Sequence, residues 1–309
     1  WIHLGGTTQN SSWHPRLLRR EEDHYNWTDC GTGATSKVPV TLLICLCGLV
    51  GNGTVLWLLG FRIRRNPITV YILNLAVANV TFLLCIATAL VIFYGPESLC
   101  HRLSLRNLTT VLTITILFAF TASVYILTAF SAVTSLSILP PSRRSCHSSQ
   151  HVPVLVCALL WALSFLLTIT LYFSPAALVV FILSYFLAVL TLIFSAVTLL
   201  ARVLCCSQQY PPRKLCAVVL LAVFFLPFFT ADFGYWLFLR VFDFSIFVFD
   251  VSLMLASVNS AINPVIYFLV GSCTSAFTLS VRAAFQGAFE GVTEPQNTGE
   301  SHSKTTVET

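Results

Sequence analysis

Long apolar segments alternate with short polar stretches along this chain of 309 residues. Seven of the apolar segments are about 20 residues or longer, which is enough for a helix to cross the hydrocarbon core of a bilayer. They cover residues 38–61, 67–94, 108–139, 152–173, 177–204, 215–239 and 244–270. Backbone polar groups must be satisfied inside lipid, and the ten-residue alternation typical of barrel strands is absent. The pattern therefore predicts seven membrane-spanning helices.

The remaining stretches have different patterns. Residues 1–37 are polar and aperiodic, which predicts an N-terminal tail without a packed core. Residues 271–289 place Phe and Leu among Ser, Arg and Gln, which is typical of an amphipathic helix lying on a membrane surface. Residues 290–309 form a tail rich in Ser, Thr and Glu. The predicted fold is an all-α membrane protein, a seven-transmembrane helix bundle over 38–270 with a short C-terminal surface helix.

Composition excludes several classes of protein. Hydrophobic residues make up 56% of the chain and charged residues only 9%, whereas soluble domains carry roughly 25% charged residues. The net charge of +5 is too small and too scattered to indicate a nucleic-acid partner. A metal cluster, a nucleophile motif and a phosphate-binding loop are all missing from the sequence, so we expect neither enzymatic activity nor a cofactor.

Basic residues are distributed unequally between the two sets of short loops. Eight follow the first, third and fifth segments, at Arg62, Arg64, Arg65, Arg143, Arg144, Arg202, Arg213 and Lys214. Three lie in the opposite loops, at Arg102, Arg106 and Arg240. The positive-inside rule then places the N-terminus outside the cell and the C-terminus in the cytoplasm. We expect a multi-pass protein of the plasma membrane.

Several modifications are expected from this orientation. Glycosylation sequons on the predicted outer side begin at Asn10, Asn26 and Asn107, although such short matches also arise by chance. Cys30 and Cys100 are the two cysteines predicted to face the oxidising exterior, so they could form a disulfide or remain free thiols. Peptide mapping under non-reducing conditions distinguishes these alternatives. Cys273 begins the surface helix, where it could be palmitoylated or remain unmodified.

Asparagines occur within the apolar segments, at Asn52, Asn74, Asn79, Asn259 and Asn263. Polar side chains at membrane depth usually face the interior of a bundle, where they could serve a switch or simply hold helices together. Asn263 is followed by Pro264 and, three residues later, by Tyr267. Pro264 frees a backbone carbonyl one turn earlier, which a polar side chain or a water must satisfy. Such a break predicts a hinge near the cytoplasmic face.

Several of these motifs resemble rhodopsin-like G-protein-coupled receptors, namely Gly51-Asn52, residues 73–79, Trp161 and residues 263–267. Longer runs are similar to the Mas-related receptors. They read WLLGFRIRRNP over 57–67, VCALLWALS over 156–164 and NPVIYFLVGS over 263–272. The resemblance implies a receptor that binds an extracellular ligand and activates a heterotrimeric G protein. It also implies an activation switch formed by Asn52, Asn79, Asn263, Pro264, Tyr267 and Thr134.

The sequence also departs from this family. Where members carry Glu-Arg-Cys at the cytoplasmic end of the third helix, this chain has Val133, Thr134 and Ser135. Asn79 stands where the family has an aspartate, which weakens the case for sodium modulation. Without the arginine, which contacts the G protein and helps to hold the resting state, we expect weak coupling. The alternatives are a receptor relic that does not signal and a small transporter, although no internal repeat supports transport.

The sequence also suggests residues for a ligand site and for a phosphorylated C-terminal tail. Asp232, Tyr235, Trp236 and Asp250 lie near the predicted outer face, where they could receive a cationic peptide or amine. Alternatively, the two aromatic residues belong to the interfacial belt. The C-terminal Ser and Thr residues could, once phosphorylated, capture arrestin, or the tail could have no partner. Unchanged internalisation after alanine replacement of these residues would favour a tail without a partner.

Overall fold

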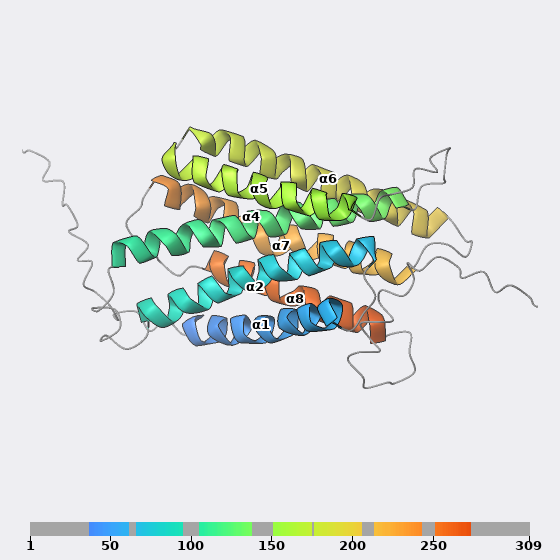
Figure 1. Cartoon of the computed structure of the whole chain (residues 1–309), viewed down its shortest axis with the longest axis horizontal. Coiled ribbons are helices and arrows are strands. Elements are labelled where there is room, and N and C mark those ends of the chain that lie inside the picture. Colours follow the sequence, from blue (N-terminus) through green and yellow to red (C-terminus); the bar gives the residue numbers. More distant parts are fainter. Residues whose placement is uncertain are drawn as a thin grey trace, which may run out of the picture.

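The computed structural model describes residues 37–61, 66–94, 105–137, 151–174, 176–205, 213–242 and 251–272. Only the backbone is described for residues 37, 93, 94, 105, 106, 205, 213, 228, 229, 231–242 and 272. Nearly all of the described residues lie in helices, shown in Figure 1. The helices are α1 (Lys37–Phe61), α2 (Pro67–Tyr94), α4 (Leu105–Ser137), α5 (Val152–Phe173), α6 (Ala177–Cys205), α7 (Arg213–Phe242) and α8 (Val251–Ser272).

The seven predicted helices are confirmed. The bounds of the first six agree with the sequence prediction to within three residues. The seventh was expected over 244–270, whereas α8 begins at Val251, and residues 244–250 lie outside the described part of the chain. Most of the N-terminal tail, nearly all of the surface helix and the whole C-terminal tail also lie outside it, so the domain boundaries stay predictions.

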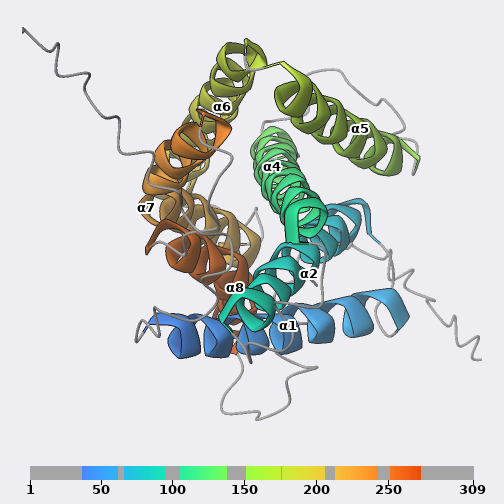
Figure 2. The same ribbon diagram turned by 90° about the vertical axis from the view of Figure 1, so that its left-hand side faces the viewer.

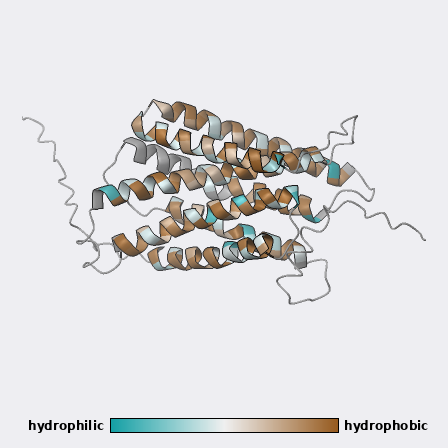
Figure 3. Cartoon of the chain, in the orientation of Figure 1, coloured by the Kyte–Doolittle hydropathy of each residue, from teal (hydrophilic) through white to brown (hydrophobic). Residues whose placement is uncertain are grey.

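Length and composition suit these helices to a bilayer. Six of them, α1, α2, α4, α5, α6 and α8, are long and apolar enough to cross a membrane. In α7 the apolar stretch within the described residues is shorter, at Lys214–Pro227, although the helix itself has 30 residues. Figure 3 shows hydrophobic residues along every helix. Such all-round hydrophobicity is expected where helices contact lipid as well as one another.

Helix α4 occupies the middle of the bundle. It is the longest described helix, with 33 residues, and it packs against α2, α5, α6 and α7. Figure 2 shows α4 with α5 and α6 beyond it on one side and α1, α2 and α8 on the other. Helix α1 contacts α2 and α8, and α8 contacts α7. The central position of α4 lets its side chains reach several neighbouring helices.

Glycine allows α1 to approach its neighbours closely. A Cβ atom at Gly48 would lie 2.7 Å from Ala261 Cβ in α8 and 2.7 Å from Leu83 Cδ1 in α2. These distances are shorter than any ordinary contact, so a larger residue at Gly48 would push the helices apart. Asn52 lies one turn further along α1. The close approach at Gly48 therefore brings the Asn52 side chain within reach of the α8 backbone.

Candidate functional site

Asn52 in α1 is the centre of a buried hydrogen-bond network. Its side chain is 1% exposed. The Nδ2 group donates one hydrogen bond to the Gly48 carbonyl at 2.9 Å, within its own helix, and another to the Ser260 carbonyl of α8 at 3.0 Å. Both hydrogens of this amide therefore have acceptors. The second bond joins two helices that are 208 residues apart in sequence.

The Ser260 carbonyl needs this donor because of Pro264. In a regular helix the carbonyl of residue 260 would accept the backbone N–H of residue 264, but proline has no N–H group. Asn52 Nδ2 supplies the missing donor at 3.0 Å. The predicted free carbonyl is thus confirmed, and its partner is the side chain of an asparagine that the sequence had already indicated.

Asn79 and Ser123 extend the network to two further helices. Asn79 Nδ2 in α2 donates to Asn52 Oδ1 at 3.5 Å, which is a long and therefore weak bond. Ser123 Oγ in α4 donates to Asn79 Oδ1 at 3.0 Å. We call Asn52, Asn79, Ser123 and the Ser260 carbonyl the polar seam. It links α1, α2, α4 and α8 in the middle of an otherwise apolar bundle.

The polar seam is electrically neutral. Its members are two amides, a hydroxyl and a backbone carbonyl, and Asn79 and Ser123 are 0% and 5% exposed. Asn79 brings an amide, with both a donor and an acceptor, to the position where the resemblance led us to expect a carboxylate. The seam can exchange hydrogen-bond partners when helices move, but it offers no fixed negative charge to a cation.

Ser123 is a residue that the sequence analysis missed. It lies in a segment that also contains Thr121, Thr128, Ser131 and Thr134, and nothing in the local pattern distinguishes it from them. Its bond to Asn79 could have been predicted only if the packing of α4 against α2 were already known. The structure brings it to Asn79 because α2 and α4 pack closely.

Thr134 lies near the other end of α4 and is fully buried. Its hydroxyl donates to the Phe130 carbonyl of its own helix at 2.8 Å, and no bond from Thr134 to another helix is present in the described residues. Val133 is half-buried and Ser135 bonds back to the Ala132 carbonyl at 2.8 Å. From Asn107 to Ser137 the helix carries no charged side chain. The position that would hold an arginine in the resembled family therefore makes only a local bond.

Two tyrosines join α6 to its neighbours, one to α4 and the other to α7. Tyr125 OH in α4 lies 2.7 Å from Ser184 Oγ, and Tyr185 OH in α6 lies 3.2 Å from Thr230 Oγ1 in α7. Each of the smaller hydroxyls donates its only proton to a carbonyl of its own helix, at Phe181 and Leu226 respectively. Both tyrosines must therefore be the donors in the bonds between helices.

A further pair joins α2 to α5. Trp161 Nε1 donates to Asn74 Oδ1 at 3.0 Å, and Asn74 Nδ2 donates to the Val70 carbonyl at 2.8 Å. The sequence indicated both residues separately as parts of family motifs. The structure shows that they are partners, which accounts for an indole and an amide at these two positions.

The other predicted site residues are only partly described. Asn263 and Tyr267 are buried in α8, at 5% and 2% exposed, close to Pro264, while Asn107 is exposed near the beginning of α4. Three of the ligand candidates are in α7, where only their backbone is described, at Asp232, Tyr235 and Trp236. The sites outside the described residues are Asp250, Asn10, Asn26, Cys30, Cys100 and Cys273. All of these assignments remain predictions.

Comparison with known proteins gives consistent relatives over most of the chain. No protein-family model matches it. Mas-related G-protein coupled receptor member X2 of Macaca mulatta is 34% identical over 90% of this chain and 90% of its own length. The human member X2 is 34% identical over 86% of each chain, and rat member X1 is 36% identical over 78% of this chain and 81% of its own. With relatives of this identity and coverage, the chain belongs to the Mas-related G-protein-coupled receptors and is a membrane receptor, not an enzyme.

Proposed function

We propose that this receptor responds to its extracellular ligand through the polar seam but activates its G protein weakly. The observation that carries the proposal is the hydrogen bond from Thr134 to the Phe130 carbonyl. An arginine at this position would offer five N–H donors and a fixed positive charge at the end of a long side chain. The threonine hydroxyl has one proton, and that proton is already bonded within α4.

Two opposite effects follow from this substitution. Without the arginine and the neighbouring carboxylate, α4 lacks the ion pair that would hold the resting state. It also lacks a principal contact for the G protein. The second effect should dominate, because a receptor that opens more easily gains no output unless the open form binds the transducer. Membrane insertion and folding should be unaffected, since the polar seam lies elsewhere in the bundle.

Restoring both side chains tests the coupling proposal in cells. The native chain and the Val133→Glu, Thr134→Arg double variant are compared by G-protein dissociation at equal surface expression. Surface level is measured with an N-terminal epitope on intact cells, and its detection also tests whether the N-terminus is outside at the plasma membrane. We expect the double variant to give the larger response. Equal responses from both chains would refute weak coupling.

We also propose that the ligand is a cationic peptide or amine. The support is chemical: α7 carries Asp232, Tyr235 and Trp236 within five residues, and a carboxylate with nearby aromatic rings attracts a positive charge. Asp250 follows in the chain just before α8. Charge reversal by Asp232→Lys or Asp250→Lys should weaken binding of cationic candidates by tenfold or more, as measured by ligand displacement. Unchanged binding in both variants would argue against this ligand class.

A further inference from the structure

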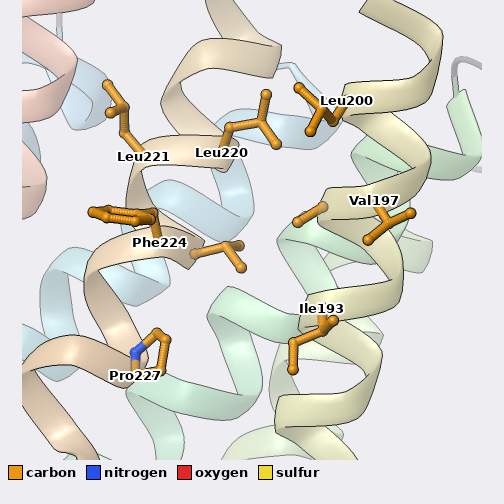
Figure 4. Close-up of a pocket in the computed structure, with 9 residues that line it drawn as sticks. Ile193, Val197, Leu200, Leu220, Leu221, Phe224 and Pro227 are labelled. Atoms are coloured by element: carbon orange, nitrogen blue, oxygen red, sulfur yellow. The ribbon is translucent and has the colours of Figure 1, made fainter.

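A cavity of about 660 Å³ lies between α6 and α7, as Figure 4 shows. Its nine lining side chains are all hydrocarbon. Ile193 and Leu200 mark its two ends on α6, and Pro227 lies across from Ile193 on α7 (Figure 4). Val197 and Phe224 are 60% and 66% exposed, so the cavity opens on the outer surface of the bundle. Because both helices belong to a membrane receptor, this surface faces lipid.

A basic residue, Lys214, lies beyond one end of the cavity, nearer the start of α7 than the lining residues. Lys214 precedes Leu221, which lines the cavity, by seven residues, and residues seven apart lie on one face of a helix. It stands six residues before Leu220, about 9 Å closer to the end of the bundle. Figure 4 places Leu200 and Leu220 at that same end of the cavity.

Arg202, near the end of α6, lies on a different face of that helix from the residues that line the cavity. It follows Leu199 by three residues and Ser195 by seven, and these two side chains are 0% and 3% exposed. Arg202 is therefore on the inward-facing row of α6. Lys214 is on the row of Leu221, and Arg213 precedes the lining residue Leu220 by seven residues, so both positions are on rows that lead to the cavity. Arg202 and Lys214 lie at the same end of the helix pair but differ in the face that they occupy.

We propose that this cavity is a binding site for an anionic phospholipid, with an acyl chain between α6 and α7 and the head group at Lys214. An apolar lining without hydrogen-bonding groups suits an acyl chain, and the lysine at its end supplies the complementary charge. Anionic lipids are concentrated in the cytoplasmic leaflet, where the proposed orientation of the receptor places Lys214. The occupant would complete the packing between α6 and α7 next to Pro227.

Tryptophan reporters test the site directly in purified full-length receptor. Val197→Trp places the reporter in the cavity, and Ala162→Trp places it on the exposed surface of α5 as a control. The variants are reconstituted in symmetric nanodiscs of phosphatidylcholine with a minor fraction of phosphatidylserine, with one lipid brominated on its acyl chain. Quenching beyond that of the parent chain reports contact with the brominated lipid. Leu200→Trp is a second reporter should Val197→Trp fold poorly.

We expect brominated phosphatidylserine to quench the cavity reporter at about a fivefold lower mole fraction than brominated phosphatidylcholine, as one basic residue predicts. The Ala162→Trp control should show no preference. Replacing Arg213 and Lys214 together by Gln should abolish the preference, because both precede lining residues by seven positions, and Arg202→Gln should retain it. Equal quenching by both lipids in the cavity would mean unselective lipid contact and overturn the proposal. Less quenching than in the control with either lipid would mean that protein, such as a second copy of the chain, covers the cavity.

The proposed orientation of the receptor decides only which leaflet of the cell membrane would supply the lipid. The reconstituted bilayers carry the same lipids in both leaflets, and the readout involves neither a ligand nor a G protein. A failure of lipid selectivity would therefore leave the coupling proposal intact, and weak or strong coupling would leave the lipid site intact.

Discussion

Asn52 fulfils a requirement that few other side chains could meet. It supplies the donor that Pro264 lacks, through the bond to the Ser260 carbonyl, and its Oδ1 accepts from Asn79. An aspartate would have no donor for the carbonyl and would place a charge at membrane depth. A hydrophobic residue would leave the carbonyl without a partner in an apolar surrounding. The amide is therefore needed for the broken helix turn of α8 as much as for any switching role.

Replacing Asn52 by alanine should lower the stability of the receptor. The change leaves the Ser260 carbonyl and one Asn79 hydrogen without their partners, which should cost about 1–3 kcal/mol. Thr54→Ala is the matched control, because Thr54 bonds only to the Val50 carbonyl of its own helix. Thermal unfolding in detergent should show a clearly lower Tm for Asn52→Ala than for Thr54→Ala. Equal Tm values would show that the polar seam adds no stability.

Single residues differ in how well the sequence reveals them. The free carbonyl before Pro264 could be predicted because it follows from the missing N–H of proline alone. Its partner could not be derived from local sequence, since Asn52 is 208 residues away. Ser123 carried no signal, because a serine in an apolar helix usually bonds to its own backbone, as Ser164 and Ser257 do here.

At the scale of helices, directed hydroxyl bonds hold α6 to its neighbours. Tyr125 donates to Ser184, and Tyr185 donates to Thr230. The Tyr185 ring also stacks on Phe120 of α4, with ring centroids 6.4 Å apart. Polar links of this kind supply specific register where lipid-facing surfaces are uniformly apolar. Thr230 follows Pro227, the proline inside α7, by three residues, so the bond from Tyr185 restrains α7 near that proline.

The two partners of the link between α6 and α7 should differ in their sensitivity to substitution. Tyr185→Phe removes a donor but leaves the Thr230 hydroxyl bonded to the Leu226 carbonyl, so we expect a loss below about 1 kcal/mol. Thr230→Val leaves the tyrosine proton without an acceptor and should cost about 1–3 kcal/mol. The test compares the free energy of unfolding of the two single variants and the double variant with that of the native chain. A larger loss for Tyr185→Phe would contradict the assigned donor direction.

Helices were easier to predict than their arrangement. Bounds followed from the length of apolar runs, since the bilayer fixes how many residues must be apolar, and α2 and α5 begin and end where expected. Which helices touch depends on side-chain shape across distant segments. The central place of α4 and the close contact of α1 and α8 at Gly48 had no signal in a single sequence.

Across the whole molecule, polar side chains in the interior bond between helices, whereas Thr134 near the end of α4 bonds, among the described residues, only within its own helix. The polar seam joins four helices through side chains that the family resemblance had indicated, together with Ser123. The end of α4 that should meet the G protein carries a buried threonine bonded to its own helix. The sequence predicted the receptor class because its long motifs, over 57–67, 156–164 and 263–272, resemble those of the Mas-related receptors. It could not reveal that Thr134 is turned inward, because that depends on packing around the helix.

The most direct test measures G-protein nucleotide exchange catalysed by purified receptor in nanodiscs. Three chains are compared: the native receptor, the Val133→Glu, Thr134→Arg variant, and this variant with Asn52→Leu added. If the end of α4 limits output while the polar seam transmits the change, the native chain should be slow and the restored variant at least tenfold faster. Adding Asn52→Leu should remove most of that gain. Exchange by the native chain as fast as by the restored variant would contradict the proposed weak coupling.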